Sequence, residues 1–111
     1  MLLTSIVTEL VDNGDLAQKI EKAKREGQKF SENFIWSVFL QVSAGLRELH
    51  SMKIAHRDVK PANIFLCKDG TVKLADMNVS KIMKRDMLKT QTGTPMYASP
   101  EVWDTAPYDL K

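Results

Sequence analysis

The segment from His56 to Asp76 reads HRDVKPANIFLCKDGTVKLAD and carries the strongest structural signal in the chain. Pro61 fixes its own φ and disfavours the helical region for the residue before it, so we expect a stiff loop here rather than a helix. Two short apolar runs follow, at 64–67 and 71–75. The Lys-Asp-Gly between them is typical of a hairpin turn, so the segment predicts a loop followed by a β-hairpin.

The polar side chains of this stretch suit the transfer of a phosphoryl group. That reaction needs a carboxylate for the proton of the acceptor hydroxyl, oxygen ligands for magnesium, and a cation near the developing charge. Asp58 can receive the proton, and Lys60 can supply the cation. Asn63 and Asp76, which the predicted hairpin brings together, can bind the metal ion.

The same residues resemble the catalytic loop and metal-binding segment of eukaryotic protein kinases, in which HRDxKxxN is followed by an Asp-led tripeptide. Downstream, residues 93–101 read GTPMYASPE and are similar to the end of a kinase activation segment. Together with the Gly-Asp-Leu at 14–16, the pattern looks most like the NIMA-related serine/threonine kinases. Four motifs in this order and at this spacing carry the resemblance.

The resemblance covers almost the whole chain and implies one partial protein-kinase-like domain over residues 1–111, α+β in class, with no second domain. Residues 1–11 would form the last strand of the small lobe and the hinge. Residues 12–111 would form the upper large lobe, with two helices, the catalytic loop, the hairpin and the activation segment. The family's glycine-rich loop and strand lysine are absent from the 111 residues, so we expect the isolated chain to be inactive.

Local patterns predict the elements around the loop. Residues 5–11 are β-branched and apolar, which indicates a buried strand. Asp15 is a good cap for a helix over 16–26. Ser31 caps a second helix that reaches Met52, and we expect its apolar stripe to be core. The stripe consists of Ile35, Val38, Phe39, Val42, Leu46 and Leu49.

The resemblance implies ATP and Mg²⁺ as cofactors and assigns residues to them. The backbone of Glu9 and Val11 would face the adenine edge, and Phe65 would form the floor beneath it. Asp15 has two compatible roles, capping the helix and facing the ribose. The residues on the phosphate side would be Lys60, Asn63 and Asp76, with Asn63 and Asp76 as the metal ligands.

Catalytic and regulatory roles are implied in the same way. Asp58, Lys60 and Thr94 would be catalytic, with Thr94 hydrogen-bonded to the other two. Lys60, two residues after Asp58, points to serine and threonine acceptors on protein substrates. Arg57 would pair with a phosphate on Thr90 and so order the activation segment.

One departure from the family pattern lies in the tripeptide at 76–78, which usually ends in Phe and Gly. Met77 can replace an aromatic side chain by volume and softness. Asn78 is the non-glycine residue that best tolerates the left-handed region, so we expect a stiffer switch that still works. His56 would brace the catalytic loop and pack under this tripeptide. Residues 79–92 are polar and predict an exposed loop.

Composition limits the partners. The net charge is +2 with basic and acidic residues interleaved, which favours neither nucleic acid nor an acidic membrane. The single cysteine, Cys67, excludes a disulfide framework and is expected to be buried in a strand, in a reducing compartment. No apolar run approaches the roughly 20 residues that span a bilayer. We therefore expect a cytoplasmic protein, with centrosomal or ciliary association by family analogy.

Three interpretations of function stay open. The parent protein is an active serine/threonine kinase, a pseudokinase that binds nucleotide or partners, or a truncated non-catalytic product that binds a partner. The first is favoured by Asp58, Lys60, Asn63, Asp76 and Thr94. Met77 and Asn78 are the only residues in favour of the second.

Overall fold

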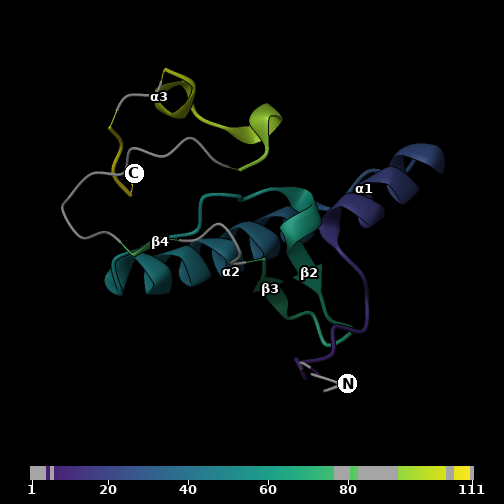
Figure 1. Ribbon diagram of the computed structural model, residues 1–111. Coiled ribbons are helices and arrows are strands. Elements are labelled where there is room, and N and C mark those ends of the chain that lie inside the picture. Colours follow the sequence, from purple (N-terminus) through teal and green to yellow (C-terminus); the bar gives the residue numbers. More distant parts are fainter. Residues whose placement is uncertain (1–4, 6, 77–80, 83–92, 105–106, 111) are drawn as a thin grey trace.

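The computed structural model describes residues 5, 7–76, 81–82, 93–104 and 107–110, with the backbone alone for 81–82. Helices and short antiparallel strand pairs follow one another along the chain (Figure 1), which confirms the predicted α+β class. In chain order the elements are α1 (Leu16–Arg25), α2 (Glu32–Ser51), β1 (Ile54–Ala55), a 3₁₀ turn (Pro61–Asn63), β2 (Ile64–Leu66), β3 (Val72–Leu74), β4 (Lys81–Ile82), a second 3₁₀ turn (Pro95–Tyr97) and α3 (Pro100–Trp103).

Both long helices begin at the predicted caps. The Asp15 carboxylate accepts from the backbone N–H of Gln18 at 2.8 Å, and the Gln18 side chain accepts from the N–H of Asp15 at 3.3 Å. This reciprocal pair is a capping box, which satisfies two of the free donors at the start of α1. The Ser31 hydroxyl accepts from the N–H of Phe34 at 3.2 Å and caps α2. Both helices end within one residue of the predicted bounds.

The predicted hairpin is present. Strands β2 and β3 pair antiparallel with Ile64 opposite Leu74, and the turn between them contains Gly70 at φ +88°. The Asp69 carboxylate accepts from the N–H of Thr71 at 2.8 Å and fixes the turn. The hairpin packs on α2 (Figure 1). The core lies between them and comprises buried Val38, Ile64 and Leu66, with Leu16, Phe34, Val42, Val72 and Leu74 against them.

The predicted strand over 5–11 is wrong for the described residues of that segment, because they form no strand. Val7 is 94% exposed and Leu10 is 84% exposed. A strand needs a neighbouring strand to hydrogen-bond its backbone groups. In the described part of the chain no strand pairs with residues 7–10.

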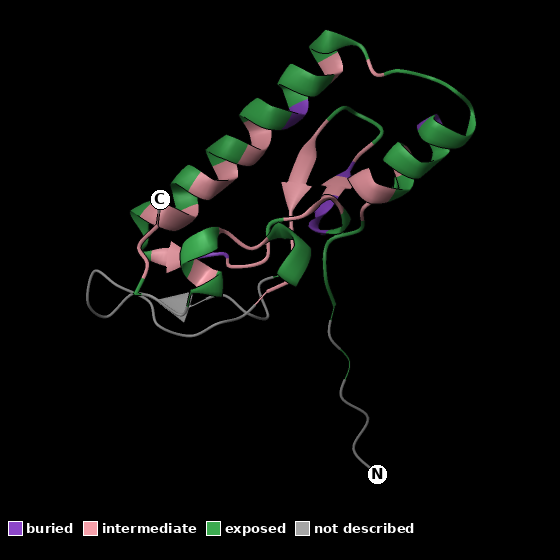
Figure 2. Cartoon of the chain, turned by 90° about the horizontal axis from the view of Figure 1, so that it is seen from above, coloured by how far each residue is buried: buried purple, intermediate pink, exposed green. Residues whose placement is uncertain are grey.

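The predicted core stripe of α2 is correct only in part. Val38 is buried and Val42, Leu46 and Leu49 are half-buried, but Ile35 is 54% and Phe39 is 59% exposed. Figure 2 shows most of the surface of α2 as exposed or intermediate. The apolar pattern identified the right helix but overestimated how much of it is covered.

Three smaller expectations also need correction. The loop expected over 79–92 contains strand β4, which pairs antiparallel with β1. Cys67 is half-buried and follows β2 rather than lying inside it. The loop after His56 ends in one 3₁₀ turn, which Pro61 can begin because its missing N–H has no partner to lose there. In the described part of the chain no helix is long and apolar enough to cross a membrane.

Candidate active site

The catalytic loop is held to the hairpin by His56, whose side chain is the largest fully buried one among the described residues. The backbone N–H of Asp58 donates to Nδ1 of His56 at 3.2 Å, so the ring proton lies on Nε2. Nε2 then donates to the carbonyl oxygen of Ala75 at 2.8 Å. The predicted bracing role of His56 is therefore visible in the contacts, with the imidazole joining the loop to the residue before Asp76.

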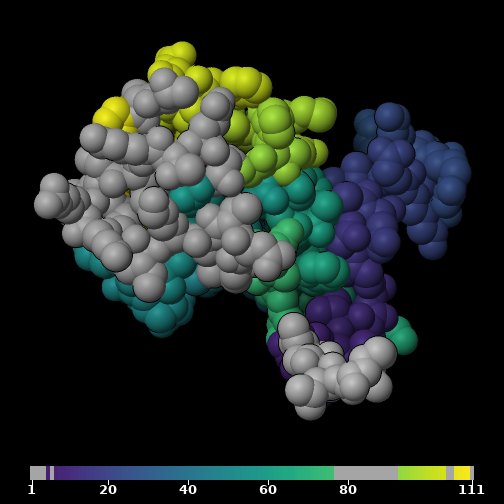
Figure 3. All heavy atoms as spheres, in the orientation of Figure 1, coloured from purple at the N-terminus to yellow at the C-terminus, as the bar shows by residue number. Residues whose placement is uncertain are grey.

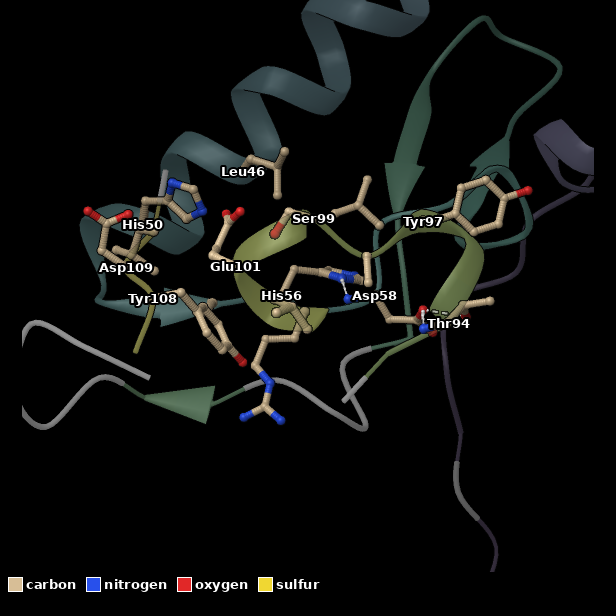
Figure 4. Close-up of a pocket in the computed structure, with 16 residues that line it drawn as sticks. Leu46, His50, His56, Asp58, Thr94, Tyr97, Ser99, Glu101, Tyr108 and Asp109 are labelled. Atoms are coloured by element: carbon tan, nitrogen blue, oxygen red, sulfur yellow. Dashed lines mark hydrogen bonds between the residues drawn. The ribbon is translucent and has the colours of Figure 1, made fainter. Parts of the chain in front are cut away.

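Thr94, Lys60 and Asp58 form one hydrogen-bonded cluster, as expected. The hydroxyl of Thr94 donates to Oδ1 of Asp58 at 2.6 Å, and its backbone N–H donates to the same oxygen at 2.9 Å. Nζ of Lys60 donates to the Thr94 hydroxyl at 2.5 Å and lies 3.2 Å from Oδ2 of Asp58. Figure 4 shows Asp58 and Thr94 side by side, with Thr94 reaching the loop from a distant part of the chain.

Asn63 completes this cluster from the 3₁₀ turn. Its Nδ2 donates to the backbone oxygen of Asp58 at 2.8 Å and to Oδ2 at 3.1 Å. Because both partners are acceptors, the amide must present its nitrogen to Asp58. Oδ1 of Asn63, the amide atom that can ligate a cation, is not used in these two bonds.

The surroundings of Asp58 keep it ionised. Partial burial raises the pKa of this carboxyl, but the hydrogen bonds from Thr94, Lys60 and Asn63 and the charge of Lys60 outweigh burial and lower the pKa below its ordinary value. Four donors contact the two oxygens, and a carboxylate has about four lone-pair sites. A further donor to Asp58 would therefore compete with these four.

Asp76 lies where the hairpin prediction put it. The N–H of Ala75 donates to the carbonyl oxygen of Asn63 at 2.9 Å, which brings the start of the tripeptide beside the catalytic loop. Asp76 is exposed and has φ +63°, a left-handed conformation that Asp adopts more readily than most residues. Met77, Asn78 and Thr90 lie outside the described residues, so the predictions for them stay predictions.

The residues expected around adenine gather at one cavity of about 540 Å³. Residues 8–11 form one side, and Phe65, Lys73, Leu74 and Ala75 form the other. Glu9 pairs with Lys73 across it at 2.8 Å. Figure 3 shows the N-terminal segment in purple against the green hairpin. The structure thus brings Glu9, Val11 and Phe65 together.

The chain between this segment and α1 pairs with the hairpin. The N–H of Leu66 donates to the carbonyl oxygen of Gly14 at 2.9 Å, and the N–H of Asn13 donates to that of Leu66 at 3.2 Å. Asp15 lies opposite Phe65 in an isolated bridge, and its Oδ1 is used in the helix cap. The capping role expected of Asp15 is therefore present, whereas a ribose contact stays a prediction.

Arg57 lines a second cavity, of about 320 Å³, between the end of α2, the catalytic loop and residues 94–102 and 108–110 (Figure 4). Its Nε is buried and has no hydrogen-bond partner within the described ranges. Its φ is +72°, a left-handed conformation in a non-glycine residue. A buried donor of this kind is costly unless an acceptor reaches it, and the predicted pairing of Arg57 with a phosphate on Thr90 stays a prediction.

One contributor to the site was not predicted. Gln41, on α2, accepts from the N–H of Val72 at 2.9 Å through Oε1 and donates to the carbonyl oxygen of Gly70 at 3.1 Å through Nε2. These bonds fix the hairpin, and with it Asn63, on the helix. The sequence feature that could have identified Gln41 is a polar residue directly beside Val42, on the apolar side of α2.

The family comparison agrees with this geometry. A model of the protein kinase domain matches residues 3–111. The match covers nearly the whole chain, and the chain belongs to the protein kinase family.

Curated relatives place it near one group of that family. The chain is 39% identical over 108 residues to the serine/threonine-protein kinase Nek3 of Mus musculus, 45% over 109 residues to Nek5 of the same organism, and 40% over 106 residues to Nek6 of Oryza sativa subsp. japonica. Each alignment takes in 96% of the chain but only 21%, 17% and 20% of these relatives, respectively. The resemblance to the NIMA-related kinases is confirmed, and the chain spans about a fifth of the relatives' length.

Proposed function

We propose that the protein containing this chain is a serine/threonine kinase that transfers the γ-phosphoryl group of ATP to hydroxyls of protein substrates. The observation that carries the proposal is the cluster around Asp58, where one ionised carboxylate, one lysine and one threonine from a distant segment are hydrogen-bonded together. The relatives named above are called serine/threonine-protein kinases, which supports the same assignment.

In the proposed reaction the acceptor oxygen forms a bond to the γ-phosphorus, the bond from that phosphorus to the bridging oxygen breaks, and ADP leaves. Asp58 accepts the hydroxyl proton. Lys60 is the donor best able to make room, because its side chain is 22% exposed and flexible, whereas Asn63 is buried. Nζ of Lys60 moves from Oδ2 of Asp58 to a phosphate oxygen, and Oδ2 then accepts a hydrogen bond from the acceptor hydroxyl.

The donor set also suits magnesium. Oδ1 of Asn63 and the carboxylate of Asp76 are oxygen ligands, and Mg²⁺ is typically bound by one or two such groups together with the substrate phosphates. When bound, the ion would neutralise phosphate charge. ATP would lie with its adenine in the cavity formed by residues 8–11 and Phe65.

The test is phosphoryl transfer from ATP to a serine/threonine peptide library by the purified full-length protein. Asp58→Asn should lower kcat by roughly 10²- to 10⁴-fold, the usual contribution of a general base, while ATP still binds. Asp104→Asn, at an exposed aspartate after α3, is the control and should keep wild-type activity. Transfer that is unchanged by Asp58→Asn would contradict the proposed role of Asp58, and a wild-type protein without transfer would contradict the proposed function.

A further inference from the structure

Gly93 lies at the point where the activation segment touches the catalytic loop. Its φ is +97°, a value that residues with a Cβ atom rarely adopt. A Cβ at this position would clash with the carbonyl oxygen of Arg57 and would lie 3.7 Å from Oδ1 of Asp58. Both the conformation and the close approach therefore require glycine.

This contact sets the position of the next residue. Thr94 directs its N–H and its hydroxyl to the same oxygen of Asp58, at 2.9 Å and 2.6 Å. Two donors of one residue can converge on one oxygen only if the preceding backbone comes close to the loop. The hydroxyl of Thr94 also accepts from Lys60, so the same approach positions the lysine.

We propose that Gly93 is a positioning residue for the catalytic carboxylate. By lacking a Cβ it lets the chain dock on the carbonyl oxygen of Arg57, which holds Thr94 on Asp58 and Lys60. The catalytic consequence rests on the proposed function, whereas the docking does not depend on it.

The test compares Gly93→Ala with Gly70→Ala in the purified full-length protein. Gly70 has φ +88°, but a Cβ there would meet nothing within 4 Å, so the control carries the left-handed strain without the clash. Amide hydrogen exchange should show the N–H of Thr94 exchanging roughly 10- to 100-fold faster in Gly93→Ala, as expected when one charge-assisted hydrogen bond is lost, and unchanged in Gly70→Ala. The kcat should fall by roughly the same factor, with the KM for ATP nearly unchanged.

A second pair, Gly93→Asn and Gly70→Asn, lessens the left-handed strain but keeps the Cβ. The same loss is expected in Gly93→Asn alone. The two proposals can fail separately. If the N–H of Thr94 loses its protection in a folded Gly93 variant but the wild type transfers no phosphate, the positioning role is supported and the proposed function is contradicted.

The proposal is overturned if the N–H of Thr94 keeps its protection in both Gly93 variants, or if protection is lost while kcat stays at the wild-type value. It is also overturned if the Gly70 variants lose as much as the Gly93 variants. Global unfolding of both Gly93 variants, with both Gly70 variants folded, would make Gly93 a residue of general stability and overturn it as well.

Discussion

Replacing His56 by Phe isolates the two hydrogen bonds that join the catalytic loop to the hairpin. The imidazole is 2% exposed and contacts the carbonyl oxygen of Ala75 and the N–H of Asp58. Phe keeps an aromatic ring, somewhat larger than the imidazole, but has no ring nitrogen. The variant therefore removes one partner from each of two backbone groups without opening a cavity.

The expected cost follows from the burial of these two groups. A buried donor or acceptor left without a partner costs about 1–3 kcal/mol, so two fully buried groups would cost about 2–6 kcal/mol. Ala75 and Asp58 are only half-buried, and water can replace part of what is lost. We expect the free energy of unfolding to fall by about 2–3 kcal/mol, and kcat to fall as the loop loses its fixed position beside Asp76.

Urea unfolding of the purified full-length protein measures this free energy. His50→Phe is the control, because His50 is half-buried in the last turn of α2. Loss of a favourable side chain at a helix end costs about 0.3–1 kcal/mol at exposed sites and at most about 2 kcal/mol at partly buried ones, so His50→Phe should cost less than His56→Phe. A free energy of unfolding of His56→Phe within about 0.5 kcal/mol of the wild-type value, the usual range for surface substitutions, would contradict the bracing role of His56.

Two further predictions concern the hairpin. Gln41→Leu should lower the free energy of unfolding by about 1–3 kcal/mol, because the backbone groups of Val72 and Gly70 lose their side-chain partners. The N–H of Val72 should also exchange faster, and equal exchange in the variant and the wild type would contradict this prediction. The hydrogen bond from the N–H of Thr71 lowers the pKa of Asp69 in the folded protein. The ionised carboxylate therefore stabilises the fold at pH values above the pKa that Asp69 has in the unfolded chain. This stabilisation is lost as the pH falls through the lower pKa of the folded protein. Urea unfolding between about pH 7 and pH 3 should therefore show a weaker acid dependence for Asp69→Asn, and an unchanged dependence would count against the assignment.

The features that could be predicted from the sequence are those whose signals are local. Asp15 and Ser31 lie next to the helices they cap, and Lys-Asp-Gly lies inside the turn it makes. In each case the hydrogen-bonding groups are at most three residues apart, so residue type alone limits the local conformation. The motif spacing also located the polar cluster, because the hairpin that returns the chain to Asn63 is itself local.

Other parts of the site depend on contacts between distant segments. The left-handed conformations of Arg57 and Asp76 could not be predicted from residue type, because neither Arg nor Asp requires φ > 0. The approach of Gly93 to Arg57 joins positions far apart in the chain. Periodicity carries no information on such pairs, although a resemblance that already links Thr94 to Asp58 could have pointed to the residue before it.

The exposed part of the α2 stripe has a geometric explanation. The helix has 20 residues and is about 30 Å long, whereas the paired strands of the hairpin have three residues each and span about 10 Å. The hairpin can therefore cover about a third of the helix, which is where Val38 and Val42 lie. Ile35 and Phe39 point elsewhere on the same helix and stay more than half exposed. A helical period reports which residues share a broad apolar side of the helix, but the length and the width of the packed partner decide how many of them are buried.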